Sequence, residues 1–441
     1  MRTPTVAAVA AIVASLTAIG LLVSPLITTT GTAQPIPGPQ IGHAWYQANG
    51  TPGADLLGQS PLNNEEQAAV ALRANGTPCA TFVTSNDNTQ PDVLVGCYNS
   101  SGWHGLASGS GYDQLTDTPT PSELPQIAVA YDGTVFVAWA ETLQTGSTKH
   151  DVRLAFFDAS SHTWTGYQQA GYDVVSLGGD ASNSFDLAVN PLTGMPALAW
   201  ANRSTTKIHY REWNGQTWTG RTGSVDTLNT ASDETVNALE PSLVLGSDGT
   251  PNVTWTNYVA TGAGEVLFRR WNGTWHGYTS QGSDNLTNTP TTSEHLSHVA
   301  VSAGGVPAVV WEDAVAPDTQ VHYTAWSGTS WRGHAGTAPD RIGTTGAAPS
   351  LAVAANGVPV VAYTQFTGST YRLLATRWNG TAWGGLAGGA QPEPIDVGDA
   401  TVNAGLHVAL VLDSTARPHV AWSYRAGGPY NTLNVAYAHW R

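Results

Sequence analysis

The strongest constraint on the fold is an internal repeat that covers almost the whole chain. A unit of about 52 to 62 residues occurs seven times, with the same order of apolar segments and turns in each copy. Each unit begins with a short apolar segment, such as residues 127–129. A glycine-containing turn and a second segment ending in an aromatic residue follow, as in GTVFVAW and GMPALAW. These segments predict two short strands joined by a hairpin.

The second half of each unit predicts two further strands. A polar loop leads to a third strand that ends at an aromatic residue, and a tight turn such as WNGQTW or WNGTAW then opens a fourth. Asn-Gly between apolar runs favours a hairpin, because both residues tolerate positive φ. Four antiparallel strands per unit, repeated around a ring, predict an all-β fold, a seven-bladed β-propeller.

The two ends of the repeat region predict how the ring closes. The last unit stops at Trp440 and Arg441 without a fourth strand, whereas Trp45 matches the fourth-strand tryptophans of the other units. We therefore expect the N-terminal strand to complete the last blade, which hides the strand edges. One propeller domain is expected over residues 34–441.

The first 33 residues predict a secretory signal peptide. Val6 to Ile27 is mostly apolar, Arg2 precedes it, and small residues up to Ala33 offer a cleavage site. An uncleaved membrane anchor is the alternative, because the apolar run is long. After cleavage we expect a secreted or extracellular monomer with no membrane contact.

The net charge of the chain excludes some classes of binding partner, and its two cysteines predict one disulfide. Lys and Arg number 17 against 32 Asp and Glu, a net charge of -15, which disfavours nucleic acid and anionic lipid. Cys79 and Cys97 fall opposite one another in the second and third strands of the first unit. In an oxidising compartment they predict a disulfide, with two free buried thiols as the alternative.

Three features recur in many units and are interpreted first as structural. The fourth-strand tryptophans are expected to pack against the neighbouring blade rather than to bind sugar. Asn-Gly-Thr triplets at Asn49, Asn75, Asn272 and Asn379 are expected to form turns rather than glycosylation sites. An aspartate about eight to thirteen residues after each tryptophan is expected to accept backbone N–H groups, with calcium or ligand sites as the alternative. These aspartates are Asp55, Asp113, Asp173, Asp226, Asp284, Asp340 and Asp396.

Ligand-binding residues are sought where the repeats differ at equivalent positions. The 4-to-1 and 2-to-3 connections share one face of a propeller, and polar residues there predict a binding funnel around a central channel; solvated strand ends are the alternative. The residues just before the first strand include Gln126, Asp186, His298 and His407. The second residues after the aromatic of the second strand include Glu141, Asn202, Asn257, Asp313, Gln365 and Tyr424.

Metal binding and catalysis have weaker support. His298, His407 and Asp186 have side chains that suit zinc, but they belong to three separated blades, so we expect no metal and no cofactor. Motifs for nucleophilic, metal-dependent and phosphate-binding enzymes are missing from the sequence. Paired carboxylates, Glu141 with Asp186 or Glu312 with Asp313, leave a glycosidase open because such pairs have no motif.

Units with a G-x-P-x-V-A-W segment followed by W-N-G-x-x-W resemble secreted bacterial propellers of the sialidase-like and propeller-lectin kind. The resemblance is architectural. Sialidases carry an Asp box, S-x-D-x-G-x-x-W, in the hairpin between the third and fourth strands, and that hairpin here has no Asp box. The resemblance implies the fold and not the activity.

These observations support one functional hypothesis and two alternatives. The first is a non-catalytic protein that binds extracellular carbohydrate through loops and inter-blade pockets on the 4-to-1 face. A glycan hydrolase or lyase, with its site at the channel mouth, is the second. A cell-surface propeller that binds a protein partner is the third.

Overall fold

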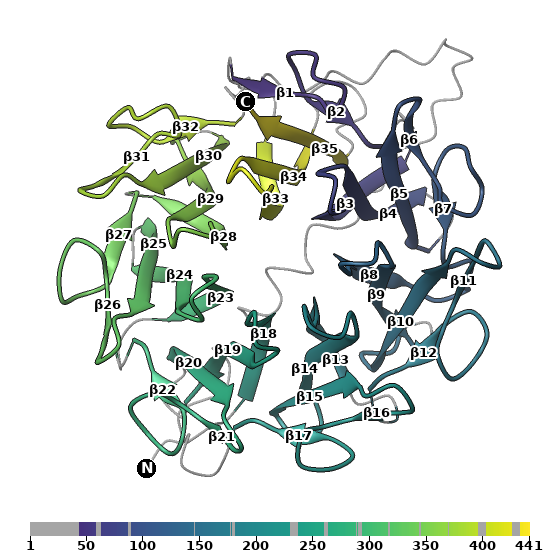
Figure 1. Ribbon diagram of the computed structural model, residues 1–441, viewed down its shortest axis with the longest axis horizontal. Coiled ribbons are helices and arrows are strands. Elements are labelled where there is room, and N and C mark those ends of the chain that lie inside the picture. Colours follow the sequence, from purple (N-terminus) through teal and green to yellow (C-terminus); the bar gives the residue numbers. More distant parts are fainter. Residues whose placement is uncertain are drawn as a thin grey trace, which may run out of the picture. The chain divides into compact units, whose positions relative to one another are not determined.

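The computed structural model describes residues 44–58, 63–86, 90–144, 146–176, 178, 181–229, 237–259, 263–287, 289, 293–315, 318–343, 345–368, 370–395, 403–425 and 433–441. These residues form an all-β ring of seven antiparallel blades, which confirms the predicted propeller (Figure 1). The predicted signal peptide, residues 1–33, lies outside the described residues. Within the described ranges, no helix is long and apolar enough to cross a membrane.

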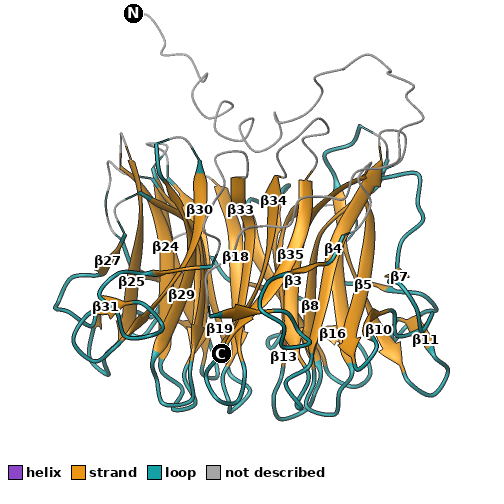
Figure 2. Ribbon diagram, turned by 90° about the horizontal axis from the view of Figure 1, so that it is seen from above, coloured by secondary structure: helices purple, strands orange, loops and turns teal. Residues whose placement is uncertain are grey.

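Each blade has its first strand nearest the axis of the ring, and the strands run between the two faces (Figures 1 and 2). The first strands are β3 (Asn63–Leu72), β8 (Ser122–Val129), β13 (Ala181–Val189), β18 (Asn237–Leu245), β23 (Glu294–Val301), β28 (Gly346–Val353) and β33 (Asn403–Leu412). The second strands are β4 (Pro78–Asn86), β9 (Val135–Thr142), β14 (Pro196–Asn202), β19 (Pro251–Tyr258), β24 (Pro307–Val315), β29 (Pro359–Phe366) and β34 (Pro418–Arg425).

The outer strands are shorter toward the perimeter. The third strands are β5 (Asp92–Asn99), β10 (His150–Asp158), β15 (Lys207–Trp213), β20 (Gly264–Trp271), β25 (Asp318–Trp326), β30 (Tyr371–Trp378) and β35 (Leu433–Trp440). The fourth strands are β6 (Gly102–His104), β11 (Thr163–Thr165), β16 (Trp218–Thr219), β21 (Trp275–His276), β26 (Trp331–Arg332), β31 (Trp383–Gly384) and β1 (Trp45–Tyr46). Blades are numbered 1 to 7 by their first strand, and the contact between neighbouring blades is called a seam.

A short fifth strand in each blade was not predicted. It pairs antiparallel with the third strand, along the same edge as the fourth strand and next to it. These strands are β7 (Asp113–Gln114), β12 (Asp173–Val174), β17 (Asp226–Thr227), β22 (Asp284–Asn285), β27 (Asp340–Ile342), β32 (Glu393–Pro394) and β2 (Asp55–Leu56). In six blades the recurring aspartate therefore starts a strand.

The ring closes as predicted. β1 pairs with β35, with Trp45 opposite Trp440, and β2 pairs with the same strand. The first strand of blade 7, β33, lies beside that of blade 1, β3. The N-terminal strand thus completes blade 7 (Figure 1).

The hydrophobic core lies in the seams. Among the described residues, seven clusters of buried side chains each join two neighbouring blades. Second-strand aromatics dominate them, and Trp139, Trp200 and Trp255 are at most 1% exposed. Burial of apolar surface is the main favourable term in folding, so packing between blades holds the ring together.

The predicted disulfide is confirmed. Cys79 and Cys97 are directly opposite one another on β4 and β5, and their sulfur atoms are bonded. Both residues are fully buried in the seam between blades 1 and 2.

Candidate functional site

The polar residues predicted to form a funnel lie within strands rather than at their ends. Gln126, Asp186 and His298 pair with the residue before the second-strand aromatic, inside the first strand of their blades. The apolar pattern marks only part of each strand, because the backbone ladder continues through the polar residues on either side.

His407 does not occupy the equivalent position, and that part of the prediction is wrong. The residue paired with Ala421, just before Trp422, is Ala409. Two overlapping apolar triplets, residues 408–410 and 410–412, both fit the pattern of a first strand. A shift of two residues preserves the alternation of faces, so the sequence alone cannot separate them.

Polar residues at this position join neighbouring blades. A backbone N–H of the next blade donates to the side chain in each of four cases. These are Leu243 N to Asp186 Oδ2 at 2.7 Å, Val299 N to Ser242 Oγ at 3.2 Å, Leu351 N to His298 Nδ1 at 3.3 Å and Leu410 N to Ser350 Oγ at 3.2 Å. This bonding explains the polarity of the position; ligand contact by these residues stays a prediction.

The second predicted set shares one register position, as expected. Each member pairs with a residue near the start of the first strand. Asn202, Asn257 and Tyr424 are buried, whereas Asp313 and Gln365 are partly buried. Glu141 is 1% exposed, and its carboxylate accepts from Thr118, Thr120, Ser122 and Trp139. Its oxygens are thus already engaged in fixing the connection between blades 1 and 2.

Burial makes the inner histidines sensitive to acid. Burial lowers the pKa of His298 to about 4, and burial also lowers the pKa of His407 to about 4. Burial also raises the pKa of Asp186 to about 6, and three hydrogen bonds oppose that shift. Ionisation of Asp186 therefore lowers the free energy of unfolding as pH rises from about 4 to 6. The buried histidines have the opposite effect, because their contribution to stability increases as pH rises.

Replacing His298 with asparagine is expected to make the fold less sensitive to acid. Between pH 6.5 and 4 the unfolded chain binds a proton at this histidine and the folded chain does not, so its contribution to stability falls as pH falls. As pH falls, the free energy of unfolding of the variant should decrease by up to about 1.4 kcal/mol per pH unit less than that of the parent. Urea unfolding at pH 7, 6 and 5 measures this. The exposed His162, replaced in the same way, is the control, and equal slopes would contradict the prediction.

The described residues contain no group of three His, Cys, Asp or Glu side chains placed to bind a metal ion.

The recurring aspartates accept backbone N–H groups, as predicted, and they also join the blades. Asp173 accepts from the N–H groups of Tyr167 and Gln168 and, at 2.9 Å, from the indole N–H of Trp218 in the next blade. The fourth-strand tryptophans therefore have the structural role that was expected. The same Trp-to-Asp bond, at 2.8 or 2.9 Å, joins Trp164 to Asp113, Trp275 to Asp226, Trp331 to Asp284 and Trp383 to Asp340.

Blade 6 departs from the predicted aspartate series. Glu393, at the start of β32, pairs with Ala375 where the other blades pair an aspartate with their third strand. The candidate named from the sequence, Asp396, lies outside the described residues. The distance in sequence from the tryptophan did not identify the equivalent residue in this blade, because that residue is a glutamate, Glu393.

The seam between blades 7 and 1 differs from the rest. Asp55 accepts the N–H of Ala48 at 2.7 Å, as its counterparts accept an N–H after their own fourth strand. The indole nitrogen of Trp103 is buried, and its contact with the carboxylate of Asp55 is looser than the Trp-to-Asp hydrogen bonds of the other seams. The clamp that closes five other seams is therefore weaker at this one.

A missing side chain opens this seam. The third residue after each fourth-strand tryptophan is long in six blades: Leu106, Tyr167, Arg221, Tyr278, His334 and Leu386. Three of these stack on the third-strand tryptophan of the next blade, with ring centroids 4.5 Å apart for Tyr167 on Trp213 and 4.5 Å for Tyr278 on Trp326. His334 stacks on Trp378 at 5.1 Å. In blade 7 this residue is Ala48, which has no ring to contribute.

Tyr98 is the third-strand aromatic of blade 1, equivalent to Trp213 of blade 3. It pairs with Trp103 as Trp213 pairs with Trp218, and the rings meet edge to face at 5.8 Å in both blades. Tyr98 is therefore the same platform without its stacking partner.

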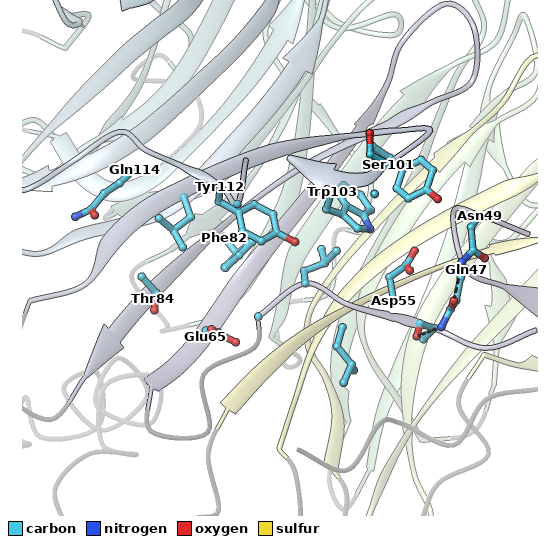
Figure 3. Close-up of a pocket in the computed structure, with 18 of the residues that line it drawn as sticks. Gln47, Asn49, Asp55, Glu65, Phe82, Thr84, Ser101, Trp103, Tyr112 and Gln114 are labelled. Atoms are coloured by element: carbon cyan, nitrogen blue, oxygen red, sulfur yellow. Dashed lines mark hydrogen bonds between the residues drawn. The ribbon is translucent and has the colours of Figure 1, made fainter. Parts of the chain in front are cut away.

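A cleft of about 1380 Å³ occupies this seam (Figure 3). Blade 7 contributes residues 47–58 in part, including Gln47, Asn49 and Asp55. Blade 1 contributes Tyr98, Ser101, Trp103, Tyr112, Gln114, Phe82, Thr84 and Glu65. Figure 3 shows aromatic rings on the blade 1 side and the amides of Gln47 and Asn49 opposite them.

Two glycines shape the blade 1 side and the floor. The ring of Tyr112 lies against Gly96, where a Cβ would come within 2.5 Å of it. Glu65 is 4% exposed, and its carboxylate lies against Gly58, where a Cβ would come within 1.3 Å. A side chain at either glycine would displace a residue that lines the cleft.

Comparisons with known proteins show the fold. No protein-family model and no curated protein matches the chain. An ulvan lyase, a polysaccharide lyase, matches with a TM-score of 0.53 and 10% identity over 91% of this chain and 94% of its own. A protein of unknown function from Dyadobacter fermentans matches with a TM-score of 0.51 and 11% identity over 88% and 97%.

More distant matches include glycan-directed proteins. The fucose-specific lectin from Aleuria aurantia matches with a TM-score of 0.43 and 13% identity over 76% of this chain and 99% of its own. Sialidases occur among the further matches. The predicted resemblance to sialidase-like and lectin propellers is confirmed as one of architecture, and likeness this distant does not transfer an activity.

The electrostatics of the cleft follow from its two carboxylates. Burial raises the pKa of Asp55, and the backbone N–H of Ala48 and the indole of Trp103 offset this only in part. In the intact clamp of blade 1 the outcome is opposite: burial raises the pKa of Asp113, but hydrogen bonds from Ala107, Trp164 and Ser108 outweigh it and leave the pKa lowered. Burial also raises the pKa values of Tyr98 and Tyr112, with a further contribution from Asp55.

Sequence reasoning missed this cleft. Its signal was a single small residue, Ala48, at a position where the other repeats carry a long side chain. The search for function looked for unusual polar residues and passed over an unusual alanine.

Proposed function

We propose that this protein is a secreted, non-catalytic carbohydrate-binding protein whose ligand lies in the cleft between blades 7 and 1. The observation that carries the proposal is the unoccupied stacking place on Tyr98. At three other seams an aromatic ring of the same protein occupies that place. The apolar face of a pyranose ring has the shape to fill it.

The polar groups of the cleft suit hydroxyl ligands. Asp55 has one carboxylate oxygen bonded to a backbone N–H, and the indole N–H of Trp103 makes only a loose contact with the same carboxylate. Gln114 and Ser101 line the same cleft. A few polar groups beside aromatic surface are the usual composition of a small-molecule site.

The acids of the cleft favour binding over catalysis. Asp55 stands at the position of Asp113, Asp173 and their counterparts, which join blades throughout the ring. A carboxylate repeated in six blades is a building element, whereas a catalytic acid is needed once. The fold is shared with a polysaccharide lyase, which fits a ligand of the carbohydrate class.

A glycan-array screen with product analysis tests the proposal. We expect the purified protein to retain unmodified glycan, and Tyr98→Ala to reduce affinity at least about tenfold, since stacking of a flat ligand such as a nucleobase on one aromatic ring contributes on the order of 1–3 kcal/mol. Tyr131→Ala is the matched control, because Tyr131 is 65% exposed and lies outside the cleft. Retention of no glycan would overturn the proposal and favour a protein partner.

A second candidate, a glycan hydrolase or lyase, rests on blade 5. His295 Nε2 lies 3.8 Å from Glu312 Oε1, and His322 Nε2 lies 3.6 Å from Asp313 Oδ2. Such pairs are suited to proton transfer. Glycan cleavage that is lost in Asp313→Asn, with Tyr98→Ala still active, would favour this candidate.

A further inference from the structure

The cleft between blades 7 and 1 continues along the strands of blade 1 well beyond Tyr98. Leu94 and Tyr98 both line it, and they lie on the same face of β5 because they are an even number of residues apart. Four residues of an antiparallel strand span roughly 14 Å. Figure 3 shows Trp103 toward one end of the cleft, Thr84 toward the other, and Tyr112 between them. The cleft is therefore longer than a single sugar ring.

Tyr112 gives the cleft a second aromatic surface, and blade 1 makes room for it. Its ring lies against Gly96, where a Cβ would come within 2.5 Å, and it meets the ring of Phe82 edge to face at 5.1 Å. The third strand has a glycine at this register position in blade 1 alone. The equivalent residues of the other blades are Ala155, Arg211, Arg269, Thr324, Thr376 and Ala438.

Tyr172 of blade 2 shows how the same ring is treated at a closed seam. It is the counterpart of Tyr112, since each directly precedes the recurring aspartate, and it meets Trp139 edge to face at 5.7 Å. The guanidinium of Arg153 lies over the Tyr172 ring, 4.4 Å from its centroid. Arg153 Nη1 lies 3.5 Å from Glu141 Oε2. A paired arginine thus covers this ring in the seam between blades 1 and 2.

Blade 1 has shorter, uncharged side chains at both of these positions. Leu94 pairs with the second-strand aromatic where Arg153 does in blade 2, and Thr84 stands at the register position of Glu141. Both residues line the cleft together with Tyr112. The ring of Tyr112 therefore has no guanidinium from its own blade over it, and a ligand can take the place that Arg153 fills at the neighbouring seam.

We propose that the cleft binds an extended oligosaccharide, with one sugar unit on Tyr98 and another unit of the same chain on Tyr112. Gly96, on which Tyr112 rests, is two residues or roughly 7 Å from Tyr98 along β5, so the two rings present separate surfaces. The cleft volume of about 1380 Å³ also exceeds the roughly 300–1,000 Å³ of a pocket for one small ligand. This inference rests on the proposed function, because it names the ligand class and a specificity-determining residue of the same site.

The dependence of affinity on chain length tests the inference. Calorimetric titrations of the full chain use mono- to hexasaccharides of β-1,4-linked glucose, xylose and mannose and of α-1,4-linked glucose and galacturonate. Fucose, galactose and N-acetylneuraminic acid are added as single sugars. In a series that binds, we expect the hexasaccharide to bind at least tenfold more tightly than the monosaccharide, and every single sugar to bind at least tenfold more weakly than that hexasaccharide.

Variants assign the effect of chain length to Tyr112. Tyr112→Ala should reduce hexasaccharide affinity at least about fivefold, the lower end of what stacking on one aromatic ring contributes, and should reduce the ratio of hexasaccharide to disaccharide affinity. Leu94→Arg should have the same effect while keeping the ring, because it supplies the cover seen on Tyr172. Tyr172→Ala is the matched control and should leave both affinities unchanged, since Tyr172 lies outside the cleft.

The outcomes separate the two proposals. Equal affinity for a monosaccharide and a hexasaccharide, lost in Tyr98→Ala, would overturn the extended-chain inference and uphold carbohydrate binding in the cleft. An unchanged affinity ratio in folded Tyr112→Ala and Leu94→Arg variants would also overturn it. Binding of none of the probes would overturn the inference, and an empty glycan array in addition would overturn the proposed function. Urea unfolding shows whether each variant is folded, and the chain-length comparison on the parent protein does not depend on any variant.

Discussion

Replacing Ala48 with tyrosine is expected to abolish carbohydrate binding while leaving the protein folded. The new ring would stack on Tyr98 as Tyr167 stacks on Trp213, where the planes are only 7° from parallel. It would therefore fill the place that the ligand needs. We expect affinity to fall at least about tenfold and the free energy of unfolding to rise by about 0.5 to 1.5 kcal/mol, the contribution of an aromatic pair.

Tyr167→Ala is the matched control for this prediction. It removes the ring at the equivalent position of blade 2 and should lower stability without affecting binding at the seam of blades 7 and 1. Calorimetric titration and urea unfolding of both variants measure the two effects separately. Full affinity in a folded Ala48→Tyr variant would show that the ligand does not occupy the cleft.

Asp173→Ala is expected to lower the free energy of unfolding by about 3 to 5 kcal/mol, because it leaves three donors, among them the buried indole N–H of Trp218, without their charged acceptor. Asp173 is 1% exposed and Trp218 is 4% exposed, so water cannot replace the lost bonds without rearrangement. Chemical denaturation measures the change.

Two further variants serve as comparisons for Asp173→Ala. Asp173→Asn keeps one acceptor oxygen and should lose less stability than the alanine variant. Asp117→Ala removes an exposed carboxylate and should change stability by less than about 0.5 kcal/mol. A loss below about 1 kcal/mol in Asp173→Ala would mean that the blades do not depend on this clamp.

The ring of blades could be predicted from the repeat because the sequence patterns that define its strands and turns each span only a few residues. Asn-Gly turns, apolar triplets and the unpaired Trp45 each concern a few residues, and together they placed Trp45 opposite Trp440. The disulfide followed from hairpin register in the same way. Local patterns of this kind are enough to assign strands and their order.

The site was harder to predict because it depends on contacts between repeats. Asp186 and His298 stand out in the sequence as polar residues beside apolar strands, but the backbone N–H groups of Leu243 and Leu351 whose hydrogen bonds they accept lie in the next blade. The cleft exists because Ala48 has no aromatic ring. The importance of that small side chain becomes clear only from the structure, in which its counterpart Tyr167 stacks on Trp213. A small residue in one repeat carries no signal until its counterparts have partners.

Closure of the ring by β1 has a consequence for how the molecule is made. The strand pair that joins Trp45 to Trp440 links the start of the described chain to its end, so it is among the least local contacts in the fold. A growing chain has β1 and β2 early but must wait for β35 before they gain a partner. Because β2 and the loop between β1 and β2 form one wall of the cleft, the proposed binding site comes into existence only at the final step of assembly.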